Sequence, residues 1–441
     1  MAGPPQGGDA PDEEHGDEPG DEPPSTPDSP FPGFNLADFN LAGLDLSGID
    51  LSGVDLTEMM RALQSTGPVN WEVASQLASV VANDGEDQEP PIDAASRAQL
   101  EELTQAAQTN VAGETGLATS VAPVRVMTRR EWATLHLDAL RPVLEQLATT
   151  LGGAFDTEAL SGELLTDAPT EVADQLAGLL PMLAPLLLGV QAGSMIGYLA
   201  QHALGRYDLP LPAADEPTVC FVLRNLDAFE ADWSLERADL RFYVAIHEVV
   251  HAAVRAVPWV RTRMVDLATE YVSGYVIDPT VLGARFGDID PSDPSALQAL
   301  AEHPDELLGA MRSEQQLEVL VRIRVFHAVL EGYADVVLDR IGRRLIPSFD
   351  RIHEAMARHR IERGEAERFV EGLLGLGTSR DDYERGATFC AGVIERAGTD
   401  GLDRLWERAE MAPTPNELDA PGLWLARIEL DLDNQERDQD G

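Results

Sequence analysis

The stretch "FYVAIHEVVHAAV", residues 242–254, predicts both the fold class and the chemistry of the chain. Apolar residues surround His247, Glu248 and His251, and no proline interrupts them, which favours a buried helix. Residues i and i+4 share a helix face, so both imidazoles can reach one zinc ion at about 2.1 Å. Glu248 is the residue type that acts as general base in such sites. The alternative is a pair of core histidines hydrogen-bonded to their neighbours.

A third zinc ligand must come from elsewhere. A histidine ligand in HExxHxxGxxH is excluded, because Val254 and Val257 stand where glycine and histidine are required. A glutamate is therefore expected, and Glu331 and Glu270 are the candidates. Glu270 follows the motif at a spacing found in some zincins, but Gly274 stands where a supporting aspartate is expected.

Glu331 is favoured because it lies in "FHAVLEGYADVVLDRIG", an apolar helical pattern with Asp335 one turn further on. An aspartate at that position could accept the second N–H of a ligand histidine. His327 is a weaker candidate for the third ligand. Without a metal, Glu331 and Asp335 would instead pair with arginines such as Arg322 or Arg324.

Hydrolysis also needs a donor that stabilises the oxyanion. The sequence does not single one out, and each candidate could equally be an ordinary structural residue. The candidates for oxyanion or substrate contacts are Tyr333, Tyr383, Arg385 and His353. The strand expected at Thr218–Leu223 could run along the cleft and pair with an extended substrate.

Composition limits the partners and the compartment. The net charge is −45, so nucleic acid and anionic membranes would be repelled. All 32 basic residues are arginine. The two cysteines, Cys220 and Cys390, lie far apart, and the acidic start lacks a secretory pattern, so a cytoplasmic protein is expected. The uncharged stretch 176–200 could span a bilayer, but its two prolines and its small residues favour a buried helix pair.

The chain divides into four regions. Residues 1–33 read as a disordered acidic tail, and 431–441 as a second acidic tail. Residues 34–66 contain five copies of a leucine-centred pentapeptide at 34–58, resembling the repeats of a four-sided β-helix, and form an arm that a protein partner could bind. Residues 67–430 are expected to form one large, mainly α-helical domain with a small β element.

Six stretches together resemble a family of bacterial zincin-like zinc-dependent metallopeptidases, one branch of which is labelled as associated with deazaflavin-cofactor biosynthesis. They are "GPVNWEVA", "LGRYDLPLP", "AIHEVVHAAVRAVPWV", "LEGYADVVLD", "DYERGATFC" and "PTPNELDAPGLWLAR", between about Gly67 and Ile428. The resemblance implies a zincin-like core with His247, His251 and Glu331 as zinc ligands and Glu248 as base. The chain departs from the family at Tyr333, where histidine is common, and in its repeat-containing arm.

We therefore expect a zinc hydrolase, and more specifically a metallopeptidase that cleaves peptide or amide bonds of a peptide or protein substrate. Zinc would activate a water and Glu248 would remove its proton. The main alternative is a non-catalytic zincin-like scaffold that recruits a partner through residues 34–58. A membrane-embedded peptidase is the third reading.

Overall fold

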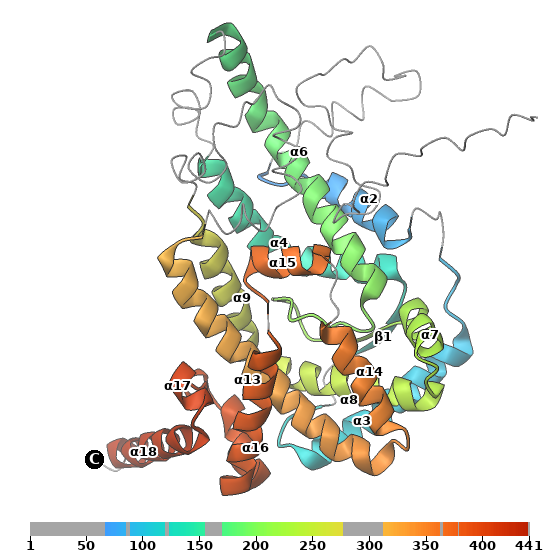
Figure 1. Cartoon of the computed structure of the whole chain (residues 1–441), viewed down its shortest axis with the longest axis vertical. Helices are drawn as coiled ribbons and strands as arrows, with labels where there is room; N and C mark the ends of the chain where they lie inside the picture. The colour runs from blue at the N-terminus through green and yellow to red at the C-terminus, as the bar shows by residue number, and fades with distance from the viewer. Residues whose placement is uncertain are drawn as a thin grey trace, which may run out of the picture.

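The computed structural model describes residues 67–84, 89–119, 123–154, 170–276, 312–361, 365–377 and 379–439. The predicted acidic tail at 1–33 and the predicted arm at 34–66 lie outside these residues. The described part is mainly α-helical with two short strands, which confirms the predicted fold class (Figure 1). Its elements are α2 (Trp71–Ala82), α3 (Ala94–Glu114), β1 (Val124–Met127), α4 (Arg129–Ala154), α6 (Thr170–His202), β2 (Val219–Val222), α7 (Leu223–Asp232), α8 (Arg237–Ala256), α9 (Pro258–Ser273), α13 (Glu314–Leu345), α14 (Phe349–Ile361), α15 (Glu365–Leu374), α16 (Arg380–Asp403), η3 (Arg404–Trp406), η4 (Ala409–Met411), α17 (Pro415–Leu418) and α18 (Pro421–Gln439).

Helix α8, which carries the HExxH motif, lies at the centre of the core. Every residue from Tyr243 to Arg255 is buried, and α3, α9, α13, α14 and β2 all pack against the helix. Figure 1 shows α13 and α14 crossing in front of it. A helix covered on all sides holds its polar side chains in fixed positions, because they have no solvent to turn into.

The small sheet pairs β1 with β2 in parallel, in the register Val124↔Val219 to Met127↔Val222. The strand predicted at 218–223 is confirmed as β2, whereas β1 was not predicted. Gly205 bridges Phe221 on the other side of β2, and all four β2 residues are buried. The expectation that this strand offers an edge to an extended substrate is therefore wrong, because neighbouring chain already occupies both of its sides.

Helix α6 spans the uncharged stretch as one helix, which corrects the expectation of a helix pair. Each proline removes only one backbone donor, and α2 packs along the last part of the helix. Gly189, Gly193 and Gly197 form a stripe at four-residue spacing, and a Cβ at any of them would overlap α2 or its N-cap residue, Asn70. Within the described residues, no helix is long and apolar enough to cross a membrane.

Candidate metal centre

Two helices bring His247, His251 and Glu331 together. The histidines are one turn apart on α8, with ring centroids separated by 4.3 Å, and Glu331 faces them from α13. One ligand atom from each residue lies within 4.8 Å of the others. Ligand atoms around a tetrahedral zinc lie about 3.4 Å apart. Small side-chain adjustments would therefore place all three on one ion.

The polar atoms in this group fit a metal better than they fit one another. His251 Nε2 is buried without a hydrogen-bond partner among the described residues, and at 3.8 Å Glu331 Oε1 is too far away to be one. Burial keeps the pKa of His251 well below its usual value, and the nearby His247, Arg255 and Arg360 lower it further, so the imidazole is neutral. Burial also raises the pKa of Glu331 against the opposing influence of Arg360 and His247. A divalent cation bound to a deprotonated Nε2 and to the carboxylate would satisfy both groups.

Glu248 lies beside the group and is fully buried. Its Oε1 is 3.8 Å from His247 Nδ1. Three backbone N–H groups, from Arg206, Tyr207 and Cys220, donate to its carboxylate. The sequence predicted the position of Glu248 but not these donors, because backbone amides leave no mark in a residue pattern.

Arg255, which is not among the predicted site residues, contacts the outer nitrogen of His251. Its Nη1 lies 2.6 Å from His251 Nδ1, and its guanidinium stacks 4.5 Å above the ring of Tyr207. Arginine only donates, so His251 Nδ1 accepts and a neutral ring then carries its proton on Nε2. Metal-binding histidines usually donate from this outer nitrogen instead. The signal was present in the sequence, because Arg255 lies four residues after His251 on the same helix.

Two acidic residues occupy positions that differ from those expected. Asp335 accepts from Arg360 Nη1 at 3.0 Å rather than from a ligand histidine, because α14 brings this arginine to the same side of α13. Glu270 pairs with Arg322 at 2.5 Å on a half-exposed surface and is not among the three clustered residues. Of the two glutamates, the structure thus places Glu331 with the histidines.

Three of the other candidates form hydrogen bonds with residues outside the group of candidate ligands. Tyr333 donates to Asp403 at 2.7 Å, His353 Nδ1 lies 3.1 Å from the hydroxyl of Tyr243, and Arg385 forms two hydrogen bonds with Asp419. Tyr383 is half-buried on α16, and His327 is buried on α13 one turn before Glu331. None of these hydrogen bonds of Tyr333, His353 and Arg385 reaches the histidine pair, so these three side chains do not supply the expected oxyanion donor in this structure.

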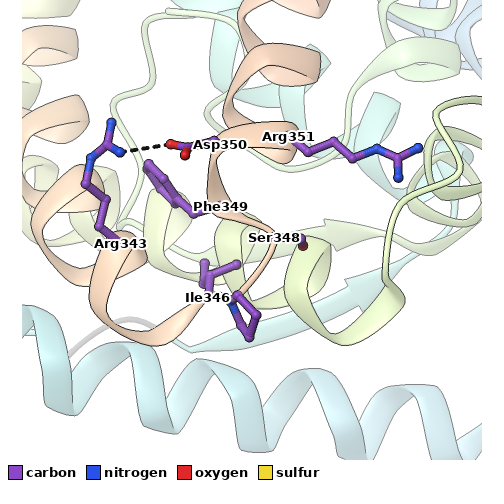
Figure 2. A pocket seen from close by; sticks show the side chains of 7 residues that line it. Arg343, Ile346, Ser348, Phe349, Asp350 and Arg351 are labelled. Atoms are coloured by element: carbon purple, nitrogen blue, oxygen red, sulfur yellow. Dashed lines mark hydrogen bonds and ion pairs between the residues drawn. The ribbon is translucent and has the colours of Figure 1, made fainter.

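The metal-ligand candidates are covered. His247, His251 and Glu331 are at most 5% exposed, so substrate entry requires the covering residues to move. A surface pocket of about 380 Å³ lies elsewhere, at the turn between α13 and α14 (Figure 2). Its lining consists of Arg343, Ile346, Pro347, Ser348, Phe349, Asp350 and Arg351. In Figure 2 the Arg343 side chain points to Asp350, whose carboxylate it contacts at 2.8 Å.

Comparison with known proteins identifies the family of the chain. The model of the zincin-like metallopeptidase family matches residues 69–425. The chain is also similar to a crystal structure from Chloroflexus aurantiacus described as a candidate hydrolase with a novel fold. The identity is 26% and the TM-score 0.54, over 82% of this chain and 99% of that one. No curated protein matches the chain significantly. Because the family model covers most of the sequence, including α8 and α13, the chain belongs to the zincin-like metallopeptidase family.

Proposed function

We propose that the protein is a zinc-dependent hydrolase that cleaves peptide or amide bonds. The observation that carries this proposal is the group of His247, His251 and Glu331, in which a buried imidazole nitrogen faces a buried carboxylate and has no hydrogen-bond partner among the described residues. Two imidazoles and one carboxylate are the donor set of many catalytic zinc sites, in which a fourth position stays open. The family to which the chain belongs supports the same reading.

Bound zinc would supply a Lewis acid that polarises the scissile carbonyl and acidifies a water. The protein's own contribution begins with Glu248, whose Oε1 lies on the side of His247. As general base, Glu248 would take a proton from the attacking water and later deliver it to the leaving amine. Burial of the site excludes bulk water, which strengthens these electrostatic interactions.

The expected setting is cytoplasmic, with a peptide or protein substrate. Cys220 and Cys390 are both free and buried, which supports a reducing compartment. The charge of −45 disfavours nucleic acid as a partner.

The first experiment measures zinc content by mass spectrometry in the full-length protein and two variants, Glu331→Gln and Glu270→Gln. We expect about one zinc per chain in the wild type and in Glu270→Gln, and almost none in Glu331→Gln. Glu270 is a matched control because it is also a helical glutamate near an arginine, outside the clustered group. Equal zinc in both variants, or a folded wild type that binds none, would overturn the site.

The second part of the experiment tests turnover on a quenched fluorescent peptide library. Zinc-loaded wild type should cleave a subset of peptides, and both Glu331→Gln and chelation should abolish cleavage. Cleavage that persists in Glu331→Gln would show that another group performs the reaction.

A non-catalytic scaffold is the second candidate function. It is favoured by the burial of the site and by the contact of Arg255 with His251 Nδ1, which opposes ordinary metal ligation. Its proposed partner-binding segment, residues 34–58, lies outside the described residues. Zinc binding without turnover, together with loss of a co-purifying partner when residues 1–66 are deleted, would favour this reading.

A further inference from the structure

The carboxylate of Glu248 is held by backbone rather than by side chains. Arg206 N donates to Oε2 at 2.9 Å, Cys220 N donates to Oε2 at 3.2 Å, and Tyr207 N donates to Oε1 at 2.9 Å. Two of these amides belong to the segment after α6 and the third belongs to β2. Three donors from two segments thus converge on one fully buried carboxylate.

The three hydrogen bonds divide unequally between the two oxygens. A carboxylate oxygen has about two acceptor positions. Oε2 fills both of its positions with backbone N–H groups, whereas Oε1 fills one. Oε1 is also the oxygen that lies 3.8 Å from His247 Nδ1. The remaining acceptor position of Glu248 is therefore on the oxygen nearer the candidate metal ligands.

Contacts that do not involve Glu248 fix these amides in place. Trp132 Nε1 donates to Gly205 O at 2.7 Å, and Val222 N donates to Leu204 O at 2.9 Å. The hydroxyl of Tyr207 accepts from Thr218 N at 3.2 Å. The segment is thus tied both to α4 and to the sheet. The donors should keep their positions when the Glu248 side chain is removed.

Gly205 is needed at this place because of its size. A Cβ at position 205 would overlap the Glu248 carboxylate. The backbone can approach Glu248 closely only because no side chain intervenes. Any larger residue would push the carboxylate away from the amides.

We propose that the backbone N–H groups of Arg206, Tyr207 and Cys220 form a preformed carboxylate cradle that positions Glu248, and that Gly205 is the positioning residue that permits it. Oε1 is the oxygen that receives the proton: an O–H bond of water breaks and an O–H bond forms at Oε1, while Oε2 keeps its two N–H donors. This catalytic part rests on the proposed function. The cradle itself does not, because it requires neither metal nor turnover.

The test removes the side chain and offers a small carboxylate in its place. Full-length Glu248→Ala, held in excess chelator, is melted with 200 mM sodium formate and with sodium chloride of equal ionic strength. Without the Glu248 side chain, the three N–H groups face a space about the size of formate or acetate. Either anion should therefore raise the Tm of Glu248→Ala by about 3 °C. Butyrate, which is too large, should raise it much less. Wild type and Glu331→Ala should move by less than about 1 °C, because neither has vacant convergent donors.

The double variant Gly205→Ala/Glu248→Ala controls for general effects of formate. The new Cβ occupies part of the emptied space, so the formate shift should disappear. In addition, Gly205→Ala alone should lower the Tm of the wild type by several degrees. Gly205→Ala in the Glu248→Ala background should lower the Tm much less, because the Cβ at position 205 overlaps the Glu248 side chain, which is then absent. Additive losses would overturn the role assigned to Gly205.

Each outcome tests one of three claims: the cradle, the role of Glu248 as base, or the proposed function. Equal melting of Glu248→Ala in formate and chloride would overturn the cradle. If Glu248→Ala is unfolded in chloride, recovery of its circular dichroism signal in formate supports the cradle, and failure in both formate and acetate counts against it. A formate shift without recovery of peptide cleavage in zinc-loaded Glu248→Ala would keep the cradle and remove the base role. Absence of zinc from the wild type would overturn the proposed function and leave the thermal result valid.

Discussion

Glu248 on α8 and Glu331 on α13 both place a buried carboxylate beside the same pair of histidines. The cradle gives Glu248 three backbone donors. No hydrogen bond from the described residues reaches Glu331, and burial raises its pKa. The difference separates a carboxylate that completes the folded scaffold from one that is left for a ligand. Removing the two charges should therefore have opposite effects on the stability of the metal-free protein.

The largest expected effect compares Glu248→Gln with Glu331→Gln in excess chelator. Glutamine at 248 has one acceptor oxygen and turns its NH₂ group toward backbone donors, so stability should fall by about 3 kcal/mol or more. Glutamine at 331 removes a buried charge that accepts no hydrogen bond from the described residues, so stability should stay unchanged or rise by up to about 2 kcal/mol. Urea denaturation measures both. Similar losses in the two variants would mean that the carboxylates have equivalent environments.

The second prediction concerns the pH dependence of the gain in stability that Glu331→Gln is expected to cause. The folded pKa of Glu331 lies above its unfolded value of 4.5, so the wild type loses stability as pH rises through the folded pKa. Glutamine does not titrate. The advantage of Glu331→Gln should therefore be present at pH 7 and vanish below about pH 4.5, where the wild-type carboxyl is protonated in both states. Urea denaturation in chelator at several pH values measures this difference. An advantage that grows toward acid would have the wrong sign.

The smallest expected effect is on zinc affinity, which Arg255 influences through its contact with His251. Arg255 donates to His251 Nδ1 and so favours the tautomer whose Nε2 cannot bind a metal. Replacing it by methionine, which is similar in length but neutral, should tighten zinc binding about tenfold. Competition with a chromophoric chelator measures the affinity. Arg241→Met is the matched control, because Arg241 is also buried on α8 but binds Asp227 and Gln99. Unchanged or weaker binding in Arg255→Met would show that this arginine supports the ligand.

Local patterns predicted the parts of the site that lie on single helices. The i, i+4 spacing of His247 and His251 and the apolar surroundings of Glu331 were sufficient, because helical geometry converts spacing into position. The expected role of Asp335 did not appear, since its partner, Arg360, comes from another helix and only tertiary packing brings them together. The cradle could not be predicted for a different reason. Its donors are backbone amides, and only the glycine at 205 leaves a trace in the sequence.

In the fold, too, local sequence patterns predicted single elements, whereas contacts between elements could not be predicted. The strand β2 was evident as an uninterrupted run of apolar residues, whereas Arg125 interrupts β1, which has the same length and pairs with β2 only in the folded chain. The single helix α6 was missed because its prolines suggested a break. The glycine stripe that accommodates α2 was visible in the sequence, but its partner helix was not.

The candidate ligands come from two helices, and His251 and Glu331 are separated by 331 − 251 = 80 positions in the chain. A metal bound between them would cross-link α8 and α13 reversibly, in addition to the apolar contact between these helices. Ligand binding to the native state alone stabilises a protein in proportion to the logarithm of free ligand concentration. Cells degrade proteins partly according to how often they unfold. The lifetime of this protein in the cell is therefore expected to follow the supply of zinc, whether or not the site turns over a substrate.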